Sequence, residues 1–170
     1  ITPKNGYNII GCVEDSITGC FLLTSSKEIS KEGAIDLLTS IGLDKIKFSK
    51  DKLTGSEVFS TLFPEDFNFI RKNKEGKTLV RIKKGNLEEG IIDKNTIGEN
   101  NGELIREFYR KYGQDKTIEL LGNIFQLGIK ILLKKGFTTG VADTDIPEEA
   151  RKKVDSMIQR AYGKIQENIE

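Results

Sequence analysis

The chain has 170 residues, of which 36% are hydrophobic and 31% are charged, and its formal net charge is +1. This length suffices for one ordinary domain or two small ones with a buried core. The near-neutral charge excludes binding of nucleic acid through a global positive field, so any such contact must come from a local patch. The absence of histidine excludes serine–histidine and cysteine–histidine nucleophilic sites and most zinc sites.

The two cysteines and the lack of a long apolar run indicate the compartment. Cys12 and Cys20 are too few for a zinc site, and we expect them to be small buried hydrophobes in a reducing cytoplasm. No apolar run reaches the roughly 20 residues that a membrane span needs, so we expect a cytoplasmic protein with no membrane contact. The sequence begins at Ile1 with neither an initiator methionine nor a signal-peptide layout, as expected for an internal segment of a longer protein.

The first third of the chain is predicted to be helical with irregular connections. Residues 13–24 are apolar enough for a buried helix, although Gly19 weakens that prediction. Ser30 is a plausible N-cap of a second helix that stops at Gly42, because apolar residues follow it at helical spacing. A short third helix is expected over residues 56–62, ending before Pro64.

The middle of the chain is predicted to form strands. Residues 67–70 are short and apolar, and residues 79–82 and 87–92 flank the sequence Lys-Lys-Gly-Asn at positions 83–86. A glycine and an asparagine between two apolar runs are typical of a hairpin turn. The middle therefore predicts a small antiparallel sheet.

The last third is again predicted to be helical. Asn100 and Glu103 have the spacing of a capping box, which opens a helix that Gly113 ends. Residues 114–135 form a longer predicted helix whose polar residues occupy one narrow stripe, so we expect it to be covered over most of its circumference. Asp145 is expected to cap a final helix with an apolar stripe on one face. The fold class is therefore α+β, mostly helical, with a small antiparallel β element in the middle and a long C-terminal amphipathic helix.

Two clusters of side chains suggest chemistry, and each has a structural alternative. Asp143, Asp145, Glu148 and Glu149 could hold Mg²⁺ or Ca²⁺. We favour a helix cap followed by acidic residues in the first turn, because the stretch lacks the ligands and glycine of a calcium loop. We therefore predict no metal site in this chain.

The basic residues Lys83, Lys84 and Lys94 could form a phosphate site, or they could be a solvated hairpin tip. The segment 98–102, with Asn100 and Asn101, could present amide groups or simply cap the next helix. From residue chemistry alone, the sequence indicates an α+β module without an active site of its own.

Several stretches, in order, resemble the largest subunit of cellular RNA polymerases, with an archaeal character near the end. The stretch 90–98 (GIIDKNTIG) resembles the family's Gly-Val-acid-Lys-Lys-(Thr/Ala)-(Val/Ile)-Gly motif, and residues 136–144 (GFTTGVADT) resemble the start of its funnel region. Further similar stretches are 10–24, 54–64, 101–105 and 122–126. Two positions depart from the family: Glu14 stands where glutamine is usual, and Asn95 stands where a second lysine is common.

The resemblance implies a non-catalytic, channel-forming segment, with residues 1–116 in the pore region and residues 117–170 at the start of the funnel region. The family's catalytic Asn-Ala-Asp-Phe-Asp-Gly-Asp loop is absent, and in the family it precedes the segment that begins at Ile1. No cofactor is implied here, since the magnesium of the complete enzyme binds outside this segment. The implied partners are other polymerase subunits, the DNA template, RNA, nucleoside triphosphates and a transcript-cleavage factor.

The resemblance also gives candidate contacts to nucleotide or transcript in the channel, namely Lys94, Thr96, Asn100 and Asn101. The alternative function is an independent protein-interaction module that docks through the helix at 147–170.

Overall fold

The computed structural model describes residues 1–44, 46 and 48–167. The chain divides into two compact units, Ile1–Gly136 and Phe137–Glu170. The elements of the first unit, in chain order, are α1 (Glu14–Thr24), β1 (Ile29–Ser30), α2 (Lys31–Thr39), β2 (Lys52–Leu53), α3 (Gly55–Ser60), β3 (Phe69–Lys72), β4 (Thr78–Lys83), β5 (Asn86–Glu89), α4 (Lys94–Ile97), α5 (Glu103–Tyr112) and α6 (Gln114–Lys135). The α+β prediction, mostly helical with a small central sheet and a long C-terminal helix, is confirmed.

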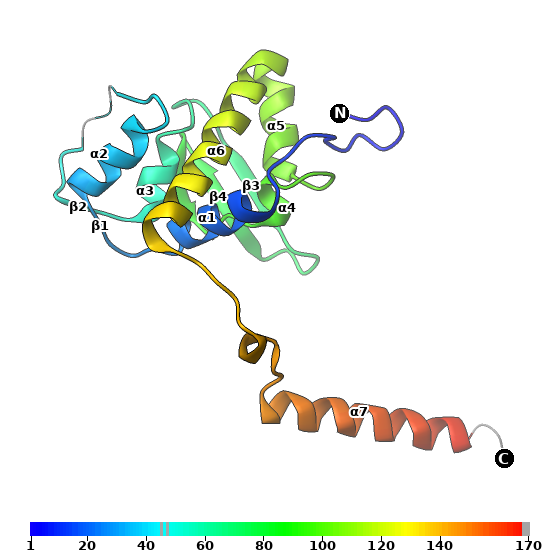
Figure 1. Ribbon diagram of the computed structural model, residues 1–170. Helices are drawn as coiled ribbons and strands as arrows, with labels where there is room; N and C mark the ends of the chain where they lie inside the picture. The colour runs from blue at the N-terminus through cyan, green and yellow to red at the C-terminus, as the bar shows by residue number, and fades with distance from the viewer. Residues whose placement is uncertain (45, 47, 168–170) are drawn as a thin grey trace. The chain divides into compact units, whose positions relative to one another are not determined.

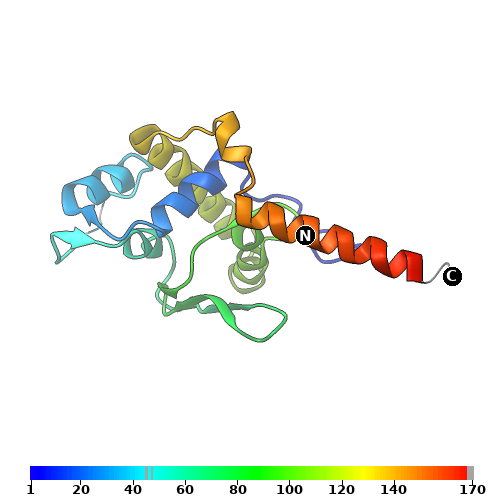
Figure 2. The ribbon, with the colours of Figure 1, turned by 90° about the horizontal axis from the view of Figure 1, so that it is seen from below.

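The core of the first unit is built around the contact between α1 and α6, which lie side by side in both Figure 1 and Figure 2. The two helices approach closely because glycines face each other. A Cβ on Gly19 would lie 2.0 Å from the carbonyl oxygen of Gly128, and one on Gly128 would lie 2.3 Å from that of Ser16. Cys20 is fully buried in this contact, and its thiol donates to the carbonyl of Ile124 at 3.5 Å. Gly19, which weakened the helix prediction, is therefore what allows the helix to pack.

Both cysteines are buried and have free thiols, as predicted. The core extends from them over the inner faces of the other helices and of the sheet. Its largest fully buried side chains include Phe59, Phe67, Leu38, Ile82 and Ile124.

The helices of the first third begin largely where the sequence predicts. The Ser30 hydroxyl accepts a hydrogen bond from Gly33 N at 3.2 Å, which confirms it as the N-cap of α2. The third helix, α3, opens with a capping box between Thr54 and Glu57. The two-residue strands β1 and β2 pair antiparallel, and the sequence did not predict them.

The predicted antiparallel sheet is present in the order β3-β4-β5. Phe69 pairs with Ile82, and Lys83 pairs with Asn86 across the second hairpin. Lys84 and Gly85 form its turn, with φ angles of +48° and +75°. Positive φ at both central positions matches the right-handed twist of the flanking strands.

Two helix-cap predictions are wrong. Asn100 does not cap α5: its φ is +63°, and the N-cap residue is Gly102. Asparagine tolerates the left-handed conformation, so residue 100 turns the chain instead. Asp145 is exposed and follows the 3-10 helix η1 (Val141–Thr144), while the last helix, α7 (Glu148–Glu167), begins three residues later. Pro147 separates Asp145 from this start.

Within the described chain alone, α6 is covered along one face, so the predicted cover over most of its circumference would need a larger assembly. Leu120, Ile124, Leu127 and Ile131 are buried along one face, but apolar residues on the rest of the helix are exposed, such as Ile118, Phe125 and Leu133. The helices α1, α2 and α5 pack against α6.

The second unit consists of η1 and α7. The apolar stripe predicted for α7 is exposed within this unit, since Val154 and Ile158 are each 46% accessible and Met157 is 68% accessible. Residues 168–170 of the predicted docking helix lie outside the described residues. Among the described helices, none combines the length and the apolarity that crossing a membrane would require.

Candidate functional site

The best-defined candidate site is the loop that carries Lys94, between β5 and α5. Asp93 caps the single-turn helix α4: its Oδ1 accepts hydrogen bonds from Thr96 N at 2.9 Å and from the Thr96 hydroxyl at 2.6 Å. One carboxylate oxygen therefore holds both the main chain and a side chain of α4. This cap fixes the direction in which the loop leaves the sheet.

Arg71, on β3, binds the same carboxylate. Its Nη1 donates to both oxygens of Asp93, at 3.0 and 3.1 Å, and its Nε lies 3.7 Å from Glu103 Oε1. The side chain of Arg71 is only 11% exposed. Burial alone would raise the pKa of Asp93, but the hydrogen bonds from Thr96 and the charge of Arg71 outweigh it and hold this pKa below its ordinary value. Asp93 therefore stays ionised and paired.

The other end of the loop is held by close main-chain packing at Gly98. Gly98 N donates to the Lys94 carbonyl at 2.7 Å, and a Cβ on Gly98 would lie 2.4 Å from that oxygen and 2.8 Å from Lys94 Cγ. A side chain at position 98 would thus displace both the main chain and the stem of Lys94. Cys12 N donates to the Ile97 carbonyl at 2.9 Å, which ties the loop to the segment before α1.

Asn8 joins the N-terminal segment to this loop. Its side-chain amide nitrogen donates to the Ile10 carbonyl at 2.9 Å and to the Gly98 carbonyl at 2.8 Å. The main-chain carbonyl of Asn8 accepts a hydrogen bond from Asn100 N at 3.0 Å. The residue is 4% exposed. The turn at residues 98–102 is therefore pinned from a position about 90 residues earlier in the chain.

The four predicted site residues fall into two groups. Lys94, Asn100 and Asn101 are exposed, and Lys94 lines a hollow of about 400 Å³ together with Val13, Glu14, Ile17 and Glu99. Thr96 is fully buried beneath them and bonded to Asp93. Solvent or a ligand can therefore reach three of the candidates. Thr96 is inaccessible and helps to hold the loop that carries Lys94.

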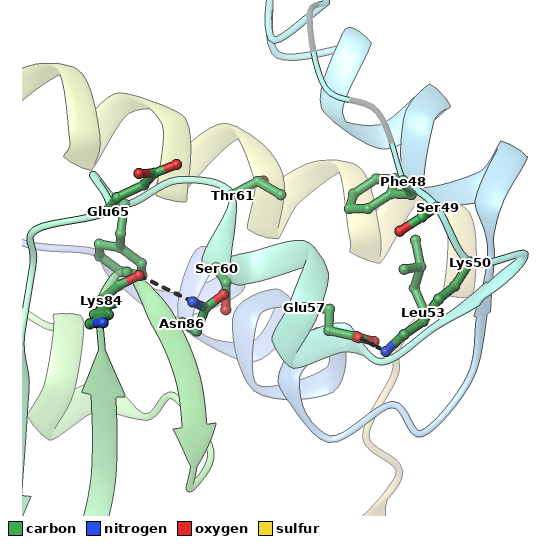
Figure 3. A pocket seen from close by; sticks show the side chains of 12 residues that line it. Phe48, Ser49, Lys50, Leu53, Glu57, Ser60, Thr61, Glu65, Lys84 and Asn86 are labelled. Atoms are coloured by element: carbon green, nitrogen blue, oxygen red, sulfur yellow. Dashed lines mark hydrogen bonds and ion pairs between the residues drawn. The ribbon is translucent and has the colours of Figure 1, made fainter.

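The basic residues do not gather at one place. Lys94 lines the hollow described above, whereas Lys84 lines a separate one of about 560 Å³ between α3 and the β4–β5 turn (Figure 3). In the second hollow, Lys50 Nζ pairs with Glu57 Oε1 at 2.7 Å, and Asn86 donates to the Lys84 carbonyl at 3.1 Å. Because Lys50 is already paired with Glu57 and the hollow contains no predicted site residue, this second hollow is the weaker candidate.

One of the acidic residues near the start of α7 is engaged by a local hydrogen bond. Asp143 Oδ2 accepts a hydrogen bond from Gly140 N, the N-cap residue of η1, at 2.7 Å. Among the described residues, no group of three potential histidine, cysteine, aspartate or glutamate ligands is placed to hold a metal ion.

Sequence reasoning missed Arg71 and Asn8. Arg71 had a weak signal: it follows Phe69 by two positions in a strand, so both side chains point to the same face of the sheet, and Phe69 is buried. An arginine at an inward position needs a buried anion as its partner. Asn8 had no such signal, because its partners are main-chain groups.

Comparisons with known proteins agree with the resemblance in the motifs. The model of the family described as "RNA polymerase Rpb1, domain 3" matches residues 1–144. The chain is similar to the "DNA-directed RNA polymerase subunit Rpo1N" of Methanococcus vannielii, at 30% identity over 100% of this chain and 21% of the relative. The proteins of the same name from Methanocaldococcus jannaschii and Sulfolobus acidocaldarius are 31% and 32% identical, over 100% and 99% of this chain.

The chain spans between 14% and 22% of the length of these relatives. The candidate loop at 90–98 and the stretch at 136–144 both fall inside the matched residues. Since the match covers most of the chain, the chain belongs to the family of RNA polymerase Rpb1, domain 3.

Proposed function

We propose that this chain is a non-catalytic, channel-forming segment of the largest subunit of a cytoplasmic, archaeal-type DNA-directed RNA polymerase. The observation that carries the proposal is the family match over residues 1–144. From the resemblance in the motifs, we assign residues 1–116 to the pore region and residues 117–170 to the start of the funnel region. Together they line the route by which nucleoside triphosphates enter and the 3′ end of a backtracked transcript leaves.

In this proposal the chemistry belongs to the complete enzyme. Magnesium ions stabilise the attacking and leaving oxygens during nucleotidyl transfer, and they bind outside this segment, whose sequence lacks the aspartate loop. The segment contributes geometry and access. Its partners are other polymerase subunits, the DNA template, RNA and nucleoside triphosphates, and a transcript-cleavage factor reaches the same channel.

Lys94 is the residue that we propose contacts nucleotide or transcript phosphate. It is exposed, and the loop that bears it is fixed at Asp93 and at Gly98. Glu14 and Glu99 line the same hollow and lower its positive potential. A lone lysine acts as a point charge without the fork of an arginine. Its contribution is therefore modest and sensitive to salt.

The test is Lys94→Ala in the complete polymerase. We expect the KM for nucleoside triphosphates to rise up to about fivefold at low salt, or cleavage of backtracked transcripts to change. Lys83→Ala is the matched control, since Lys83 is an exposed lysine that does not line the hollow of Lys94. Wild-type elongation, nucleotide dependence and cleavage at low salt would contradict the role of Lys94.

The isolated chain is expected to have no polymerising activity, with or without Mg²⁺. The physical reason is the missing aspartate loop, without which the attacking and leaving oxygens have no metal to stabilise them. Template-dependent RNA synthesis by the purified 170-residue chain would refute the non-catalytic assignment.

The exposed apolar stripe of α7 favours a second candidate, an independent protein-interaction module that docks through this helix. In that case Met157→Glu should abolish binding of the isolated chain to its partner. The same substitution should matter less than Lys94→Ala for nucleotide dependence of the complete enzyme if the channel proposal holds.

A further inference from the structure

The Lys94 loop is held by a charged side chain on β3 of the central sheet. Arg71 lies 22 positions before Asp93 and reaches both of its carboxylate oxygens with one nitrogen, Nη1. The same nitrogen lies 3.5 Å from the Thr96 hydroxyl, and Nε faces Glu103, the first residue of α5. One guanidinium therefore contacts the cap of α4, the interior of α4 and the start of α5.

The contacts from Cys12 and Asn8 hold the C-terminal end of this loop, whereas the contact from Arg71 holds its N-terminal end. The helix α4 has only four residues, so it cannot be stable without outside support. Its N-terminal support is Asp93, and the carboxylate of Asp93 is fixed in turn by Arg71. Since Lys94 follows Asp93 directly and its stem lies against Gly98, its direction depends on this carboxylate.

The environment of Arg71 favours a positioning role over a surface ion pair. Its side chain is 11% exposed, whereas that of Arg81 on the neighbouring strand is 43% exposed and lies 3.7 Å from Glu89. A largely buried guanidinium that contacts three groups has little freedom to move, and removing it leaves the half-buried carboxylate of Asp93, 38% exposed, without its cation. An exposed pair such as Arg81 with Glu89 contributes little.

We infer that Arg71 is a positioning residue that aims Lys94 into the channel by holding Asp93, and that nucleotide binding therefore depends on it. This inference rests on the proposed function for its substrate, the phosphate groups of a nucleoside triphosphate. Arg71 does not itself touch the nucleotide; it acts through Asp93 and the α4 turn.

The experiment uses the complete polymerase with Arg71→Met, Lys94→Ala and the double variant in its largest subunit. Steady-state addition of ATP gives KM and kcat, and hydrogen exchange reports on residues 93–98. We expect Arg71→Met to raise KM about two- to fivefold with kcat nearly unchanged, and to speed exchange at 93–98. The KM of the double variant should be no higher than that of Lys94→Ala alone, because both changes remove the same interaction.

Two further variants keep the test decisive if Arg71→Met does not assemble. Asp93→Asn retains an oxygen that can cap α4 but loses the charge that pairs with Arg71, so it should show the same rise in KM. Arg81→Met is the control on the next strand and should behave as the wild type.

The outcomes separate the two proposals. Unchanged exchange at 93–98 in Arg71→Met, or effects on KM that add to those of Lys94→Ala, would overturn the positioning role. Faster exchange together with a wild-type KM in Lys94→Ala would confirm the anchor and overturn the proposed contact of Lys94 with nucleotide.

Discussion

At the scale of single residues, burial controls the chemistry of the two thiols. Cys12 is 1% exposed and Cys20 is fully buried. Burial raises the pKa of the Cys12 thiol from 9.0 to about 11 and that of Cys20 further still. The folded chain therefore keeps both thiols protonated at pH values at which an exposed thiol ionises. Thiolates are the reactive form, so neither cysteine is expected to be a nucleophile.

This difference in pKa predicts how stability depends on pH. A folded-state pKa above the unfolded value means that the unfolded chain loses protons first as the pH rises. The contribution of Cys12 is complete below about pH 9 and is lost as the pH rises toward about 11, and that of Cys20 is lost over a range that extends to higher pH. Urea unfolding at pH 8, 9.5 and 10.5 should show this fall, and a Cys12→Ala, Cys20→Ala variant should show a smaller one. Rapid alkylation of the folded wild-type chain at pH 7 would contradict the burial of these thiols.

Alanine substitutions at two candidate capping positions should differ in their effect on the free energy of unfolding. Ser30 accepts the hydrogen bond from Gly33 N, so Ser30→Ala should lower the free energy of unfolding by about 0.5–2 kcal/mol. Asp145 lies outside α7, so Asp145→Ala should change it by no more than about 0.5 kcal/mol. Chemical denaturation followed by circular dichroism measures both values. A larger loss for Asp145→Ala than for Ser30→Ala would mean that Asp145 caps α7 in solution.

At the scale of elements, the contact between α1 and α6 depends on residues without side chains. Gly128 allows the main chain of α1 to lie against α6, and a methyl group there would meet the carbonyl of Ser16. Two helices at this separation share many small dispersion contacts. The position therefore requires glycine for packing, not for an unusual φ angle.

Substitutions on α6 provide a matched test of this close packing. Gly128→Ala should lower the free energy of unfolding by about 1–3 kcal/mol, because the added methyl overpacks a main-chain contact. Gly122→Ala, on the same helix with no atom within 4 Å of its Cβ position, should raise it by about 0.5–1 kcal/mol. Thermal or urea unfolding of the two variants gives the comparison. Equal effects would show that the close approach does not limit packing.

The sequence predicted the longer elements and not the shortest ones. The helices α2, α5 and α6 and the β4–β5 hairpin carry a periodic apolar pattern or a turn signal. The pair β1–β2 has two residues in each strand and α4 has four residues, so neither is long enough to show periodicity. Partners distant in the sequence stabilise such elements. The sequence did not predict which face of α6 is covered within this chain, because composition shows how apolar a helix is and not which neighbours lie against it.

The candidate site was only partly accessible to sequence reasoning for a similar reason. Lys94 was found because it matches a family motif. The residues that hold its loop, Arg71 and Asn8, bond to groups 22 and 90 positions away. No local pattern encodes such pairings. Thr96 was in the same motif, but only the structure shows that its hydroxyl is used internally by Asp93.

At the scale of the whole molecule, the first unit contains its own core. All residues of the hydrophobic cluster lie between Cys12 and Ile131, and the second unit begins at Phe137. A chain that ends at Gly136 should therefore unfold cooperatively with a Tm within a few degrees of that of the full chain. Calorimetry of the two proteins tests this expectation. Loss of the transition on truncation would show that α7 contributes to the stability of the first unit.

The pinning of the candidate loop by Asn8 has a consequence for how the chain folds as it is made. The amide of Asn8 and the carbonyl of Gly98 are 90 positions apart, so this closure has a high contact order and is slow compared with the formation of any helix. On the ribosome, the N-terminal segment must wait until the whole β3–β5 sheet has emerged before it can settle. The loop that carries Lys94 can therefore reach its final conformation only after residue 98 has emerged, and the α1–α6 contact, which joins groups 104 positions apart, closes later still.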